Sequence, residues 1–194
     1  MIRKSTAQRQ QDIVSAVLSL IAESGIQGVT MARIAGRVGL TEAALYRHFK
    51  GKLAIVGATI DRAFDELLEA LEPAGRGGDV LGKLKAALTA HVSFVEGRPW
   101  MARILFSDEV HFNSKELKQK LIARGDEVAQ RIGGMLALGK ATGELDRELD
   151  VQSAVVMYRG IVQAQVMLWT QGKLERLMER QEGLWTLYRR AIGG

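Results

Sequence analysis

The sequence contains no cysteine and only 2 prolines among its 194 residues. Without thiols the chain can form no disulfide, no thiolate metal site and no cysteine nucleophile, and a reducing compartment suits it. The shortage of proline permits long helices. Aromatic residues make up only 6% of the chain while hydrophobic residues make up 47%, a balance that favours an aliphatic, helix-packed core over disorder.

Uninterrupted apolar runs long enough to span a membrane are also absent. The first apolar segment, IVSAVLSLIA at residues 13–22, follows a basic start and could mimic a signal peptide. Its serines, and the helical spacing of Ile13, Val17 and Leu20, favour a soluble amphipathic helix instead. We therefore expect a cytoplasmic protein that does not bind membranes.

Helical periodicity dominates the rest of the chain, and no convincing run of alternating strand residues occurs. The sequence predicts an all-α fold of about nine helices. Its clearest internal break is EPAGRGGD at residues 72–79. Near FNSKEL, Asn113 is predicted to cap a helix, with Phe112 packing against Leu117. A continuous last helix is predicted from Leu174 to Ile192.

The formal charge of +5 is unevenly distributed. Eight basic and three acidic residues precede position 54, which accounts for the whole excess, and the remainder of the chain is balanced. A polyanionic partner for the first quarter is the natural hypothesis. The alternative is a basic face that is merely solvated.

The segment TMARIAGRVGLTEAALYRHF, at residues 30–49, has helix-turn-helix spacing. Thr30 and Thr41 are predicted helix caps, and Gly39 can adopt the left-handed conformation of a tight turn. Leu45 and Phe49 are predicted to face the core, which leaves the opposite face free. A plain hairpin of two helices has the same spacing, but the localised positive charge favours a nucleic-acid partner.

That free face suits a DNA major groove. Its slim first turn, Thr41 to Ala43, can approach base edges, while the Tyr46 hydroxyl and nearby cations can reach phosphates. Thr30 lies at a second helix N-terminus, where backbone amides favour an anion. Glu42 would need a base donor such as cytosine, or a neighbouring cation such as Arg47.

Residues 8 to about 56 resemble the DNA-binding domain of tetracycline-repressor-like (TetR) transcriptional regulators. The resemblance rests on Thr30, the Ile34–Ala35 pair, Gly39 and the LYRHF…K ending. It implies phosphate contacts by Thr30, Tyr46, His48 and Lys52. With the residues named above, the predicted DNA-binding set is Thr30, Arg33, Thr41, Glu42, Ala43, Tyr46, Arg47, His48, Lys50 and Lys52.

The expected domains are a helix-turn-helix DNA-binding domain at residues 1–51, a connecting helix at 52–72 and a helical effector-binding and dimerisation domain at 79–194. Apolar residues around the fifth and sixth helices are either simple core or the wall of an effector cavity. The candidate pocket residues are Phe94, Trp100, Met101, Ile104, Leu105 and Phe106. In the family the last two helices pair with their copies; the candidate interface here is Tyr158, Ile161, Val162, Trp169, Leu177, Leu184, Trp185 and Tyr188.

Enzymatic and metal chemistry find little support in the sequence. Two G-x-x-x-x-G-K matches, at residues 77–84 and 134–141, lack the serine or threonine that would hold magnesium. Asp108 and Glu109, considered with His91 and His111, are better interpreted as ordinary polar residues than as a metal site. We expect no enzyme, no metal and no cofactor.

The sequence therefore predicts a homodimeric transcriptional regulator, most simply a repressor of a palindromic operator that responds to a small apolar or amphipathic ligand. One alternative keeps DNA binding but replaces the ligand with a protein partner, as in a nucleoid-occlusion factor of the same fold. A second alternative is a helical scaffold that binds only protein.

Overall fold

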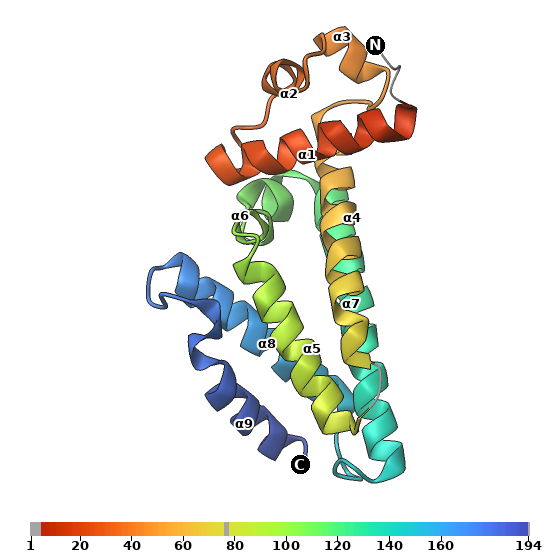
Figure 1. Ribbon diagram of the computed structural model, residues 1–194, viewed down its shortest axis with the longest axis vertical. Coiled ribbons are helices and arrows are strands. Elements are labelled where there is room, and N and C mark those ends of the chain that lie inside the picture. Colours follow the sequence, from red (N-terminus) through yellow and green to blue (C-terminus); the bar gives the residue numbers. More distant parts are fainter. Residues whose placement is uncertain (1–4, 76–77, 194) are drawn as a thin grey trace. The chain divides into compact units, whose positions relative to one another are not determined.

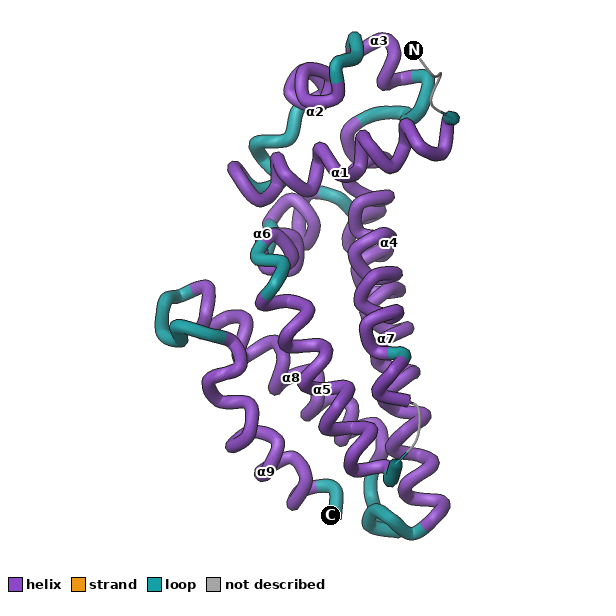
Figure 2. The backbone as a smooth tube through the Cα atoms, in the orientation of Figure 1, coloured by secondary structure: helices purple, strands orange, loops and turns teal. Residues whose placement is uncertain are grey.

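The computed structural model describes residues 5–75 and 78–193, and within these ranges the chain forms nine α-helices and no strand (Figures 1 and 2). The predicted all-α fold is thus confirmed. Three short segments adopt other helical forms: η1 (Pro73–Gly75), η2 (Glu109–Asn113, a π-helical turn) and η3 (Leu177–Arg180). The α-helices are α1 (Thr6–Ser24), α2 (Met31–Val38), α3 (Glu42–Tyr46), α4 (Lys52–Leu71), α5 (Val80–Glu96), α6 (Trp100–Leu105), α7 (Lys115–Thr142), α8 (Val151–Thr170) and α9 (Gln181–Ala191).

Most helix boundaries follow capping signals in the sequence. The Asp79 side chain accepts a 2.7 Å hydrogen bond from the Gly82 amide and so begins α5. Asp150 begins α8 in the same way, by accepting from Gln152 at 3.1 Å. Near the end of α4, Arg131 donates to the Leu68 carbonyl at 2.8 Å, where carbonyls lack partners within the helix.

The segment before α7 differs from its prediction. Ser114, not Asn113, caps α7, because its hydroxyl accepts from the Leu117 amide at 3.2 Å. Phe112 is 81% exposed while Leu117 is 0% exposed, so the two do not pack together as predicted. The physical reason is the π-helical turn of η2, whose wider spacing changes the direction in which Phe112 projects.

The last predicted helix is also shorter in the structure. The tight 3-10 segment η3 precedes α9, which runs only over Gln181–Ala191. Leu174 lies before both segments and is buried. The apolar periodicity that predicted one helix therefore came from a turn and two helical segments that bury their apolar side chains separately.

The chain divides into two compact units that differ from the expected domains. The first unit comprises Met1–Phe64 with Pro99–Arg124, and the second comprises Asp65–Arg98 with Gly125–Gly194. Both α4 and α7 contribute residues to each unit. The proline and glycine break at residues 72–79 therefore does not mark the boundary between these compact units. Two residues of that break, Arg76 and Gly77, lie outside the described residues.

The first unit is organised around α1, which packs against α2 and α6. The apolar stripe predicted for α1 is buried: Ile13, Val17 and Ile21 are all 0% exposed. From the helix-turn-helix segment, Ile34 and Leu45 complete this core and are likewise 0% exposed. Burial of these side chains fixes which face of the segment is left at the surface.

The second unit is organised around α5, which packs against η3, α8 and α9. Two carboxylates accept hydrogen bonds from the backbone amides of the first residues of helical segments. Glu96 accepts from the Leu177 amide at 2.7 Å, and Glu144 accepts from the Val80 amide at 2.7 Å. These bonds join segments far apart in the sequence, so they hold η3 and the loop after α7 against α5.

Close packing explains one glycine of the second unit. Gly139 lies within α7, and a Cβ added there would lie 2.7 Å from Leu145 Cγ and 2.8 Å from Val80 Cγ1. The glycine therefore permits the approach of the following loop and of α5. Residues 134–141 form part of a continuous helix, so this G-x-x-x-x-G-K match is no phosphate-binding loop.

Candidate nucleic-acid interface

The turn between α2 and α3 has the geometry predicted from its sequence. Thr30 accepts from the Arg33 amide at 3.2 Å to cap α2, and Thr41 accepts from the Ala44 amide at 3.2 Å to cap α3. Between them, Gly39 has φ 66° and ψ 38°, the left-handed conformation that favours glycine. The Leu40 amide then donates to the Ala35 carbonyl at 2.9 Å and closes the turn.

The outer face of α3 is open to solvent. Thr41, Glu42 and Ala43 are exposed at its first turn, and Tyr46 is 55% exposed at its end. A partly exposed aromatic ring with a hydroxyl can contact the sugar-phosphate backbone without losing core packing. The helix itself is short and ends at Tyr46.

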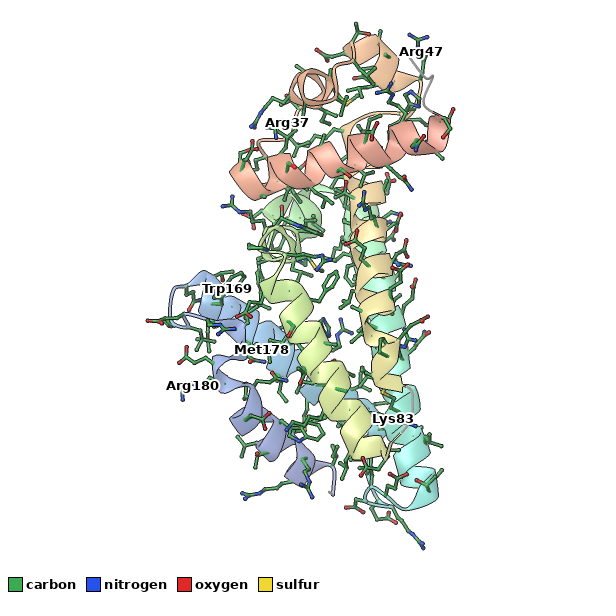
Figure 3. All side chains as sticks on the ribbon, viewed as in Figure 1. Arg37, Arg47, Lys83, Trp169, Met178 and Arg180 are labelled. Carbon is green, nitrogen blue, oxygen red and sulfur yellow. The ribbon has the colours of Figure 1, made fainter. Side chains whose placement is uncertain are left out.

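Two cations near this face pair with none of the described residues. The side chains of Arg47 and Lys50 are exposed and have no ion-pair partner among the described residues. Figure 3 shows Arg47 projecting outward beside α3. Glu42 likewise has no cationic partner within the described chain, so the suggested Glu42–Arg47 pair does not form.

The two arginines of α2 are in a different situation. Arg37 makes two 2.9 Å hydrogen bonds to the Glu23 carboxylate on α1, and Figure 3 shows it on the side of α2 that faces α1. Arg33 also lies 3.6 Å from Glu23 and donates to Ser24 Oγ at 2.8 Å and to the Gly28 carbonyl. The Arg37 contact lowers the pKa of Glu23, and Glu23 raises the pKa of Arg37.

The Arg33 guanidinium holds the end of α1 and the loop before α2, and its part in DNA binding stays a prediction. No local pattern in the sequence indicates the network, because Glu23 and Arg37 are separated by fourteen residues. Among the other predicted phosphate contacts, Thr30 and Tyr46 are exposed, whereas His48 and Lys52 are only partly exposed.

His48 and Lys52 follow α3 and are only half-buried. The His48 Nδ1 atom is buried without a hydrogen-bond partner, and its backbone carbonyl accepts from Gln10 Nε2 at 3.3 Å. Lys52 is the first residue of α4. Arg3 and Lys4, counted in the basic excess, lie outside the described residues.

The predicted effector residues divide between burial and exposure. Phe94, Met101 and Ile104 are 6%, 3% and 3% exposed, whereas Phe106 is 42% exposed. Trp100 and Leu105 are intermediate. Phe94 belongs to the second unit and the other five to the first. Within the second unit, the Arg98 guanidinium lies 3.9 Å from the centre of the Phe94 ring.

The predicted dimer residues also divide. Tyr158, Val162, Leu177, Trp185 and Tyr188 are 0–6% exposed and belong to the core of their own chain, so they cannot offer surface to a copy. Ile161, Trp169 and Leu184 keep intermediate exposure; Figure 3 places Trp169 near the end of α8. The exposed apolar side chains of α8 and α9 are instead Val156, Met157, Met167, Leu168 and Leu187.

Among the described residues no group of three or more histidine, cysteine or acidic side chains could hold a metal ion. In the same part of the chain, no helix has both the length and the apolarity needed to cross a bilayer.

The sequence matches two family models. Residues 13–59 match "Bacterial regulatory proteins, tetR family", and residues 77–171 match "Tetracyclin repressor-like, C-terminal domain". The chain is 30% identical over 142 residues to the nucleoid occlusion factor SlmA of Actinobacillus pleuropneumoniae serotype 5b (strain L20), an alignment that covers 72% of this chain and 70% of that protein.

Solved structures share the fold at lower identity. The transcriptional regulator FadR from Bacillus subtilis, in complex with stearoyl-CoA, superposes with a TM-score of 0.83 at 23% identity, over 94% of this chain and 98% of FadR. The regulator PfmR from Thermus thermophilus superposes with a TM-score of 0.73 at 24% identity, over 99% of this chain and 98% of PfmR. Taken with the capped helix-turn-helix and its open cationic face, these matches show that the chain belongs to the tetR family of DNA-binding bacterial transcriptional regulators, which are not enzymes.

Proposed function

We propose that the chain is a homodimeric repressor that binds a palindromic operator through α3 and releases it when a small apolar or amphipathic ligand binds. The observation that carries the DNA-binding half is the exposed face of α3, where slim side chains adjoin cations with no partner among the described residues. Thr41 to Ala43 would meet base edges, and Tyr46, Arg47 and Lys50 would contact phosphates.

A second copy of the chain is the proposed partner of α8 and α9. Met157, Ala164 and Leu168 are exposed at spacings that place them along one face of α8. Gly160 and Gly183 are also exposed, and a Cβ at either would meet nothing within 4 Å. Small residues beside exposed apolar side chains let two helices approach closely. A two-fold dimer would place two reading helices on one face of DNA, a whole number of turns apart.

Ligand response would follow from population shift. A ligand that prefers a dimer with wrongly spaced reading helices must weaken operator binding by the same factor that the operator weakens ligand binding. Since α4 and α7 each contribute to both units, a change in the second unit has a continuous covalent route to the first. FadR of Bacillus subtilis, whose fold this chain shares, was solved with stearoyl-CoA, which supports an acyl ligand as the first to test.

Binding of the full-length chain to fragments of its own genome would test this proposal. The expected result is a small set of promoter fragments bound at physiological salt and released by stearoyl-CoA. Weak binding that is indifferent to sequence would refute the operator. Specific binding that no acyl compound changes would refute the acyl ligand.

The similarity to nucleoid occlusion factors supports one second candidate. In that case the chain would bind many scattered chromosomal sites and use a protein partner instead of a ligand. Mapping the bound sites in living cells separates the two, because a repressor concentrates at a few promoters whereas an occlusion factor does not.

A further inference from the structure

A histidine and a tyrosine form a polar pair inside the second unit. The hydroxyl of Tyr158 on α8 lies 3.4 Å from Nδ1 of His91 on α5, and the two ring centres are 5.9 Å apart. Tyr158 is 1% exposed, and burial raises its pKa, so its phenol stays protonated and needs an acceptor. Nδ1 of His91 is the acceptor that the described residues provide.

Because the buried Tyr158 phenol needs an acceptor, we assign His91 the tautomer that accepts at Nδ1. A neutral ring that accepts at Nδ1 carries its hydrogen on Nε2. Nε2 of His91 makes no hydrogen bond to a described residue, and this atom is not fully buried. The pair therefore presents an unused N–H donor.

His91 is desolvated by the protein around it but keeps part of its surface exposed. Desolvation lowers the pKa of His91 to about 4, which requires protein on most sides of the ring. The residue nevertheless keeps intermediate exposure. The ring is thus largely surrounded by protein but not sealed, so a ligand group can reach it.

A second unsatisfied group lies on α8. Gln165 follows Tyr158 by seven residues, which places it on the same face of the helix about 10 Å further along. It is 2% exposed; its Nε2 donates to the Ile161 carbonyl at 3.3 Å, while its Oε1 is buried without a partner. This atom is an acceptor that finds no donor among the described residues, and an ester or thioester has none to offer, so Gln165 takes no part in the recognition proposed below.

We propose that Nε2–H of His91 recognises an uncharged carbonyl group of the effector, such as an ester, thioester or amide. The proposal rests on the proposed ligand response and names the chemical class of that ligand. Because the imidazole is neutral near pH 7, it offers a carboxylate no charge to pair with. A carbonyl on an otherwise apolar body fits a neutral donor in a desolvated wall.

The test uses three probes that differ only in the polar group: methyl decanoate, sodium decanoate and decane. Their affinities are measured on the full-length chain and on His91→Phe. The matched control is Tyr188→Phe, because the Tyr188 hydroxyl already donates to the Ala154 carbonyl at 3.0 Å and lies in the same aromatic cluster. It removes a buried hydroxyl without touching the donor.

The wild-type chain and Tyr188→Phe should both bind the ester most tightly. His91→Phe should weaken ester binding by about three- to tenfold, the worth of one neutral hydrogen bond, and leave decane unchanged. An equal loss for ester and decane, or tighter binding of decanoate than of the ester by the wild type, would overturn the proposal. If no probe binds the wild type, the acyl ligand of the proposed function falls as well.

Nitrogen NMR of the imidazoles gives an independent readout without a ligand. The chain has only 3 histidines, so the signals missing in His91→Phe identify His91. We expect a neutral ring with its hydrogen on Nε2 at pH 7 and a shift of that nitrogen when methyl decanoate is added. A hydrogen on Nδ1 would refute the donor.

Discussion

Arg47 and Arg37 should differ sharply in their effect on DNA binding, although both are arginines of the helix-turn-helix segment. The Arg47 side chain is exposed without a partner among the described residues, whereas both terminal nitrogens of Arg37 bond to Glu23. Each phosphate contact contributes about 0.9 to the slope of log affinity against log salt. Arg47→Ala should therefore reduce the slope of a dimer by about 1.8, and Arg37→Ala should leave it nearly unchanged.

Fluorescence anisotropy between about 50 and 200 mM salt measures this difference. Over that fourfold range a slope change of about 1.8 means that the ratio of wild-type to Arg47→Ala affinity shrinks about 12-fold. Arg37→Ala is the matched control, since it removes the same charge from the same segment. Equal slopes for Arg37→Ala and Arg47→Ala, whether both reduced or both unchanged, would refute the distinction between a scaffold arginine and a phosphate contact.

Three other perturbations follow from the structure. Gly139→Ala should destabilise the chain by about 1–3 kcal/mol in urea unfolding, because the added Cβ overpacks the helix against its neighbours. Gly134→Ala in the same helix, where a Cβ meets nothing within 4 Å, should stabilise the chain by about 0.5–1 kcal/mol. Changes of the same sign for both variants would contradict the packing argument. Burial lowers the pKa of His91 to about 4, so its contribution to stability is full above the unfolded pKa near 6.5 and is lost as the pH falls from there toward 4. Relative to His91→Phe, the wild type should lose about 2 kcal/mol of unfolding free energy between pH 7.5 and 5. Parallel pH profiles of the two proteins would contradict the lowered pKa. Leu187→Glu and Leu168→Glu should shift the dimer to monomer in analytical ultracentrifugation and leave helicity by circular dichroism unchanged. An intact dimer would contradict an interface at these side chains.

The helix-turn-helix could be predicted from sequence because its signals are local. Caps at Thr30 and Thr41 and the left-handed Gly39 act within a few residues, and each has the predicted geometry. The start of α7 shows the limit of local signals. There a π-helical turn changed which residue caps the helix, and nothing in the FNSKEL pattern distinguishes Asn113 from Ser114.

Side chains that meet across long sequence separations could not be predicted. Tyr158 and Tyr188 have the apolar periodicity of an interface, but η3 and α5 cover the core side of α8 and α9 and bury them. Periodicity identifies a buried face without saying whether the same chain or a copy covers it. For the same reason the His91–Tyr158 pair, 67 residues apart, had no signal in the sequence.

Selection of binding sites from random DNA with the full-length chain tests the central claim most directly, because it asks whether the α3 face reads sequence. The account predicts enrichment of an inverted repeat whose half-sites are a whole number of helical turns apart, bound at least about 10³-fold more tightly than scrambled DNA at physiological salt. Alanine at Tyr46 should weaken binding to all sequences alike. No enriched motif, with equal affinity for selected and scrambled DNA, would contradict the account.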